Sequence, residues 1–207
     1  MALEDASGPS VCAEGRGAPV RPARPALATT YEGGAPSLFE RIADQVDLLE
    51  IAPDSISRTT ETGCAIDRDI LAELKEIGRD KGFLIHGVGL SIASADAWQD
   101  DYLQLLDELF EHLPVVWHSE HLGYTRVDGE QLGTMLPPPR TREALDLICE
   151  RVATLRARYP VPFLLEHIVR ILPDSGGDYS DAEFMNALAR ETHRSRLCAS
   201  FVASIAR

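Results

Sequence analysis

The feature that most constrains the fold of this chain is a repeated alternation of apolar segments with amphipathic segments. Four apolar segments have the length of buried strands, at residues 46–53, 82–90, 115–124 and 161–169. In the stretches between them, apolar residues recur every three to four positions, the period of a helix that buries one face. A strand followed by a helix, repeated along the chain, predicts a parallel sheet covered by helices.

Helix-capping residues mark four expected helix starts, at Ser37, Asp67, Thr141 and Ser180. Ser37 and Ser180 are each followed three residues later by a glutamate, which is the spacing of a capping box. Residues 101–113 have the pattern of a further amphipathic helix. With a weak strand at 26–31 and a last strand at 197–206, the sequence predicts about five to six strand–helix units.

Titratable residues stand near the end of each of the four apolar segments, at Glu50, His86, Glu120 and Glu166. They are separated by 36, 34 and 46 residues, about one strand–helix unit each. Parallel strands present their carboxyl ends at one edge of the sheet, so we expect these side chains to converge on one pocket. In a (β/α)8 barrel this edge holds the active site. A doubly wound open sheet is the alternative, but the chain has neither GxGxxG nor GxxxxGK[ST].

Histidine and carboxylate side chains together suit a divalent metal such as iron, manganese or zinc. A single histidine or glutamate at a strand end is more often a hydrogen-bonded structural residue. For His118 we prefer a structural role over a role as metal ligand. Side chains alternate along a strand, which places His118 on the same side as Glu120. A structural role is also preferred for His112, which lies in the last turn of a helix, where a cation suits the helix dipole.

Composition restricts the class of protein further. The 207 residues include 33 acidic and 20 basic side chains, a net charge of −13, which argues against nucleic acid or an anionic membrane as the main partner. The four cysteines are widely spaced without CxxC, which favours a reduced, cytoplasmic protein. No apolar run reaches the roughly 18 residues of a membrane span. Residues 1–25 have the composition of a disordered tail, so residues 26–207 are expected to form the folded domain.

Four motifs occur in one order along the chain: HGVGLS at 86–91, SEHLGY at 119–124, MLPPPRTREAL at 135–145 and LLEHIV at 164–169. In this combination the sequence resembles the multinuclear non-haem iron-dependent oxidases, which are (β/α)8-barrel (TIM-barrel) proteins of the xylose-isomerase-like type. The resemblance extends from about residue 30 to residue 190. It implies an iron-dependent oxidoreductase with two or three iron ions that uses dioxygen to modify small ribosomally made peptides, often presented by a partner protein.

Carried over by position, the resemblance places metal ligands at His86, Glu120, Glu166, His167 and, more weakly, Glu50. Glu120 corresponds to the carboxylate that can bridge two irons, and the neighbouring His121 is expected to orient it. The resemblance assigns no catalytic residue beyond these ligands.

The chain departs from the family pattern at three places. Tyr31 and Glu32 follow the first strand where a histidine is usual, and His167 replaces an asparagine. Residues 196–207 lack the carboxylate and histidine of a sixth strand, and five or six strands cannot close an eight-stranded barrel. The sequence therefore predicts a truncated, incomplete barrel with weakened metal binding and little or no oxidase turnover. Two alternatives remain: a sugar-isomerase-like or endonuclease-like barrel that uses manganese, magnesium or zinc, and a non-catalytic fragment.

Overall fold

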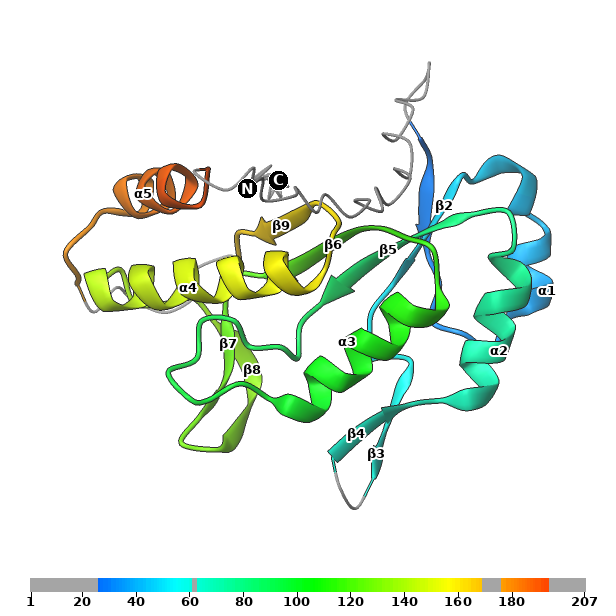
Figure 1. The fold of residues 1–207 in the computed structure, drawn as a ribbon, viewed down its shortest axis with the longest axis horizontal. Helices are drawn as coiled ribbons and strands as arrows, with labels where there is room; N and C mark the ends of the chain where they lie inside the picture. Colours follow the sequence, from blue (N-terminus) through cyan, green and yellow to red (C-terminus); the bar gives the residue numbers. More distant parts are fainter. Residues whose placement is uncertain (1–25, 61–62, 169–175, 194–207) are drawn as a thin grey trace, which may run out of the picture.

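The computed structural model describes residues 26–60, 63–168 and 176–193 of the chain. In these ranges, five parallel strands form one sheet in the order β1–β2–β5–β6–β9 (Figure 1). They are β1 (Ala28–Thr30), β2 (Leu48–Ile51), β5 (Gly82–Gly87), β6 (Val115–His121) and β9 (Phe163–Glu166). The strands of this sheet lie side by side in the order in which they occur along the chain. The predicted parallel α/β arrangement is therefore confirmed.

Helices cover one face of this sheet. They are α1 (Pro36–Glu40), α2 (Arg68–Ile77), α3 (Asp100–His112), α4 (Arg142–Arg158) and α5 (Asp181–His193), with a short 3₁₀ turn at Ala43–Gln45. Alternate strand residues, including Leu49, Phe83, Ile85 and Phe163, are buried in one core with the apolar faces of α2, α3 and α4. The residues between them face the other way and are largely half-exposed, including Glu50, His86 and Glu166. The sheet therefore has a helix side and an open side.

Three of the four predicted helix caps are present. The Asp67 carboxylate accepts hydrogen bonds from two backbone N–H groups of the first turn of α2, and the Thr141 hydroxyl accepts one from Ala144. Ser180 and Glu183 form the reciprocal bonds of a capping box, at 2.8 and 3.3 Å.

The predicted capping box at Ser37 is wrong. Helix α1 has no side-chain cap, and it begins at Pro36, one residue earlier. Proline suits the first position of a helix because its ring fixes φ and its missing N–H would have no partner there. The start of α1 is therefore set by the proline rather than by a serine side chain.

Two antiparallel hairpins, absent from the prediction, extend beyond the carboxyl ends of β2 and β6 (Figure 1). They pair β3 (Ser57–Thr60) with β4 (Gly63–Ile66), and β7 (Tyr124–Val127) with β8 (Glu130–Leu136). The turn between β7 and β8 is Asp128–Gly129, with φ of 52° and 81°. An Asp–Gly pair readily adopts two successive positive φ values, so this hairpin had a recognisable signal in the sequence.

Two predicted segments lie outside the described residues, the tail at 1–25 and the last strand at 197–206. None of the helices in the described ranges has the length and hydrophobicity that crossing a membrane requires.

A buried arginine holds the connection from β5 to α3. Arg151 of α4 is 6% exposed, and its guanidinium donates to the backbone carbonyl oxygens of Ile92, Ser94 and Asp96. Its guanidinium carbon lies 4.8 Å from the centre of the Trp98 ring. One side chain thus satisfies several carbonyl groups of a connection that follows directly from the HGVGLS motif.

Replacing Arg151 with methionine is expected to lower the free energy of unfolding by about 3 kcal/mol, because buried carbonyl oxygens lose their donors. For a domain of this size that corresponds to a fall in Tm of roughly 6–12 °C. Arg158→Met on the same helix is the matched control, because Arg158 pairs with Asp107 at the surface, with side-chain exposures of 41% and 42%. Such pairs contribute up to about 1 kcal/mol. Equal effects of the two changes in urea denaturation would contradict the assigned role of Arg151.

Candidate metal centre

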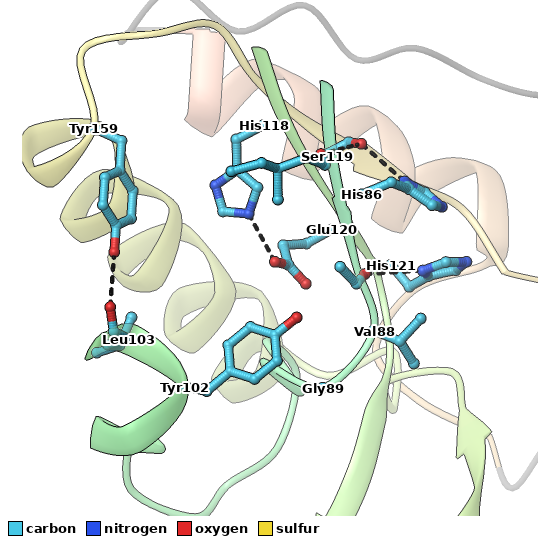
Figure 2. Close-up of polar contacts among 12 residues, drawn as sticks. His86, Val88, Gly89, Tyr102, Leu103, His118, Ser119, Glu120, His121 and Tyr159 are labelled. Carbon is cyan, nitrogen blue, oxygen red and sulfur yellow. Dashed lines mark hydrogen bonds and ion pairs between the residues drawn. The ribbon is translucent and has the colours of Figure 1, made fainter. Parts of the chain in front are cut away.

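Three side chains on the open side of the sheet come together at the carboxyl ends of neighbouring strands. His86 is the second-last residue of β5, His121 ends β6 and Glu166 ends β9, and each offers one ligand atom within 4.8 Å of the other two. His121 and Glu166 are register partners across the sheet. The rings of His86 and His121 lie 4.5 Å apart between centroids, on the same side of the strands (Figure 2). This cluster is the candidate metal centre.

A cavity of about 300 Å³ opens beside this cluster. Its lining combines carboxylates, one imidazole and apolar side chains: Glu50, His86, Trp117, Ser119, Leu164, Leu165 and Glu166. His86 and Glu166 are 23% and 29% exposed, so an ion or a small substrate group can reach them from solvent. Glu50 accepts a hydrogen bond of 3.0 Å from the Thr30 hydroxyl. The structure therefore brings His86, Glu50 and Glu166 to one cavity.

Both histidines make a fixed contact through Nδ1. His121 Nδ1 lies 3.0 Å from the backbone oxygen of Gly87, and a carbonyl oxygen only accepts hydrogen bonds. Nδ1 of His121 therefore carries a hydrogen, and in the neutral ring the lone pair is on Nε2. His86 Nδ1 lies 2.8 Å from the hydroxyl oxygen of Ser119, while its Nε2 lies 3.1 Å from a carboxylate oxygen of Glu166.

Glu120 does not share this cavity, which departs from the predicted convergence of four strand ends. Side chains alternate along β6, so Ser119 and His121 face the open side while His118 and Glu120 face the helices (Figure 2). Glu120 is 1% exposed and lies 2.7 Å from His118 Nε2. The prediction considered the position of Glu120 along the strand but not the side on which it projects. His118 is the buried, hydrogen-bonded residue that alternation predicted.

Two carboxylate contacts, one with Glu120 and one with Asp54, explain two glycines of the HGVGLS motif. A Cβ on Gly87 would lie 2.2 Å from a carboxylate oxygen of Glu120, so no larger residue fits there. A Cβ on Gly89 would lie equally close to the Asp54 carboxylate, which accepts hydrogen bonds from Val88 N–H and the Tyr102 hydroxyl.

Burial raises the pKa of Glu120, and the hydrogen bond from His118 opposes this shift.

His167 lies outside the centre. It follows the last residue of β9, its side chain is exposed, and it lines a different hollow with Pro137 and Pro138. Adjacent strand residues project to opposite sides, so Glu166 and His167 do not reach the same ion. His121, expected only to orient a carboxylate, instead belongs to the cluster. The sequence shows, by alternation, that His121 lies on the same side of its strand as Ser119. It does not show the strand register that places His121 beside Glu166.

The two described cysteines lack the features of a nucleophile. Burial, reinforced by nearby carboxylates, raises the pKa of both Cys64 and Cys149 to about 11. The thiolate fraction at pH 8 should therefore be about 100-fold below that of an unperturbed cysteine, and alkylation correspondingly slow. Iodoacetamide labelling followed by peptide mass mapping, with urea-unfolded protein as the control, tests this. Labelling of Cys64 or Cys149 at the same rate in native and unfolded protein would contradict the prediction.

Comparison with known proteins gives one family and one fold. A family model for the RiPP precursor modification enzymes MbnB/TglH/ChrH matches residues 35–197. The chain is 33% identical over 114 residues to a UPF0276 protein of Streptomyces avermitilis, a match that covers 52% of this chain and 23% of the relative. It is 34% identical over 122 residues to a UPF0276 protein of Caulobacter vibrioides, covering 59% and 44%. The matched region thus spans less than half the length of either relative.

Among solved structures, that of L-ribulose 3-epimerase, a TIM-barrel enzyme, is similar with a TM-score of 0.50 and 17% sequence identity. The similarity covers 85% of this chain and 60% of the epimerase, and at this identity it concerns the fold alone. Together with the five sequentially ordered strands in the described ranges, it confirms the predicted incomplete TIM-barrel fold.

Proposed function

This chain belongs to the family of RiPP precursor modification enzymes MbnB/TglH/ChrH, and on that premise we propose that it holds iron at His86, His121 and Glu166 and modifies a ribosomally made peptide. The resemblance drawn from the sequence motifs is to this same family. The observation that carries the proposal is the convergence of these three side chains at one rim of the sheet.

The donor set fits iron. Two imidazoles and one carboxylate, with further positions open, form the ligand set typical of non-haem Fe(II) oxygenases. The contact of His121 Nδ1 with a backbone oxygen leaves Nε2 for the metal, which is the usual second interaction of a metal-bound histidine. A bound iron would supply redox chemistry with dioxygen at the positions that the protein leaves open.

The remaining cavity residues shape the site around the ion. Trp117 and Leu164 give the cavity an apolar wall. Glu50 lines the same cavity and offers a carboxylate to a second ion. A volume of about 300 Å³ admits one side chain of a peptide rather than a folded domain. The peptide would therefore insert a single residue while its backbone stays outside. The family resemblance implies that a partner protein presents it there.

Loading the protein with Fe(II) without oxygen tests this function. After desalting, we expect iron to be retained, but more weakly than a complete set of family ligands would hold it. On adding air and a cysteine-containing peptide, we expect at most slow oxygen uptake and a slow change of peptide mass, each requiring both iron and peptide. Parallel loading with manganese, magnesium and zinc is the comparison. Retention of one of these ions in preference to iron, with no oxygen uptake, would instead support the divalent-metal isomerase-like alternative.

A further inference from the structure

We propose that Ser119 is a positioning residue of the metal centre, whose hydroxyl accepts the Nδ1 hydrogen of His86 and so leaves Nε2 to bind the metal. The inference rests on the proposed function, because it concerns how the chain prepares a ligand for that metal. It assigns the serine of the SEHLGY motif a task that neither the ligand set nor the family match assigns to it.

The sheet brings the two side chains together. His86 on β5 and Ser119 on β6 are register partners, and both face the open side. The His86 Nδ1 to Ser119 Oγ distance is 2.8 Å. Ser119 is only 8% exposed, so little water reaches its hydroxyl to compete for this contact. The pair therefore acts as one preorganised unit in the lining of the cavity.

The Ser119 hydroxyl has one hydrogen, and we assign it to the contact with Ile85, whose backbone oxygen can accept but not donate. Ser119 Oγ donates to that oxygen at 3.1 Å. The Ser119 oxygen must then act as the acceptor toward His86. Nδ1 of His86 therefore carries the hydrogen, as Nδ1 of His121 does toward the Gly87 oxygen.

Glu166 favours the opposite arrangement when no metal is bound. Its carboxylate lies 3.1 Å from Nε2 of His86 and can accept a hydrogen from it. Without the Ser119 hydroxyl, the neutral ring would place its hydrogen on Nε2, facing Glu166, and that form cannot bind a metal through Nε2. Ser119 thus counteracts the effect of Glu166, so that the metal meets a lone pair rather than a hydrogen.

The test compares Ser119→Ala with Ser119→Thr, which keeps a hydroxyl and suits a strand. The probes are Zn²⁺ and Mn²⁺ alone, titrated by calorimetry, together with two-bond ¹H–¹⁵N spectra of the histidine rings in metal-free protein. The chain has six histidines, so the His86 signals can be assigned with a His86→Gln variant. Thermal melting checks that each variant is folded.

We expect the alanine variant to bind both metals 10–100-fold more weakly, the usual effect of losing the hydrogen-bond partner of a metal-bound histidine. Its His86 hydrogen should move from Nδ1 to Nε2, and the threonine variant should match the parent in both respects. An alanine variant with parental affinity and an Nδ1 hydrogen would overturn the inference. So would a threonine variant as weak as the alanine variant. If the parent bound no metal, the proposed function would fail, while the spectra would still decide the role of Ser119.

Discussion

Replacing His86 or His121 with alanine is expected to weaken Fe²⁺ or Mn²⁺ binding by more than about 100-fold. Losing only an outer hydrogen-bond partner costs a metal site 10–100-fold, so losing a ligand should exceed that range. Each substitution removes one of the three ligand atoms that lie within 4.8 Å of one another. Both histidines are half-exposed at the rim, so the fold should tolerate the loss of either ring. Calorimetric titration of each variant under anaerobic conditions measures the effect.

The matched control for these variants is His167→Ala. His167 was a predicted ligand, but its exposed side chain lines another hollow. Its removal should leave the metal affinity within about twofold of the parent, as expected for a surface change with no contact to the site. A large loss for His167→Ala, with little loss for His121→Ala, would reverse the assignment of the ligands made from the structure.

Substitutions of Glu120 and Glu166 are expected to have opposite effects: one should lower stability and the other should lower metal affinity. Glu120→Ala should lower the free energy of unfolding by about 3 kcal/mol or more, because it removes one partner of a buried pair. Among the described residues, the Nε2 contact with Glu120 is the only hydrogen bond of the His118 ring, whose Nδ1 has no partner. The variant, if it remains folded at low temperature, should still bind metal.

Glu166→Gln should give the opposite outcome. The amide keeps the shape of the side chain but supplies a much poorer metal ligand, and the position is 29% exposed. Its unfolding free energy should stay within about 0.5 kcal/mol of the parent, as for most surface changes, while metal affinity falls sharply. Urea denaturation and metal titration of both variants give the four values needed. A Glu120→Ala protein that is stable but cannot bind metal would show that this carboxylate is a ligand after all.

Much of the fold could be predicted from the sequence because its signals are local. The period of apolar residues located α2, α3 and α4, and the capping side chains of Asp67 and Thr141 fixed two of their starts. Continuous apolar segments located β2, β5, β6 and β9. The hairpin β7–β8 was missed although Asp128–Gly129 signals its turn, because the apolar segment before it was extended to Tyr124.

The candidate site could be predicted only in part, because its geometry depends on pairing between strands. The recurrence of titratable residues at strand ends located His86, Glu50 and Glu166, which line one cavity. Because adjacent side chains of a strand project to opposite faces of the sheet, Glu120 and His121 must lie on opposite sides. Alternation does not say which of the two faces the open side. That choice follows from the register, which sets His121 beside Glu166 and Glu120 beside Gly87. No local pattern in the sequence contains this information.

Anomalous diffraction at the iron absorption edge, from crystals grown with Fe(II) and without oxygen, tests the central assignment most directly. We expect the strongest peak between Nε2 of His86, Nε2 of His121 and the Glu166 carboxylate. A strongest peak beside His167, or between His118 and Glu120 on the helix side of the sheet, would contradict it.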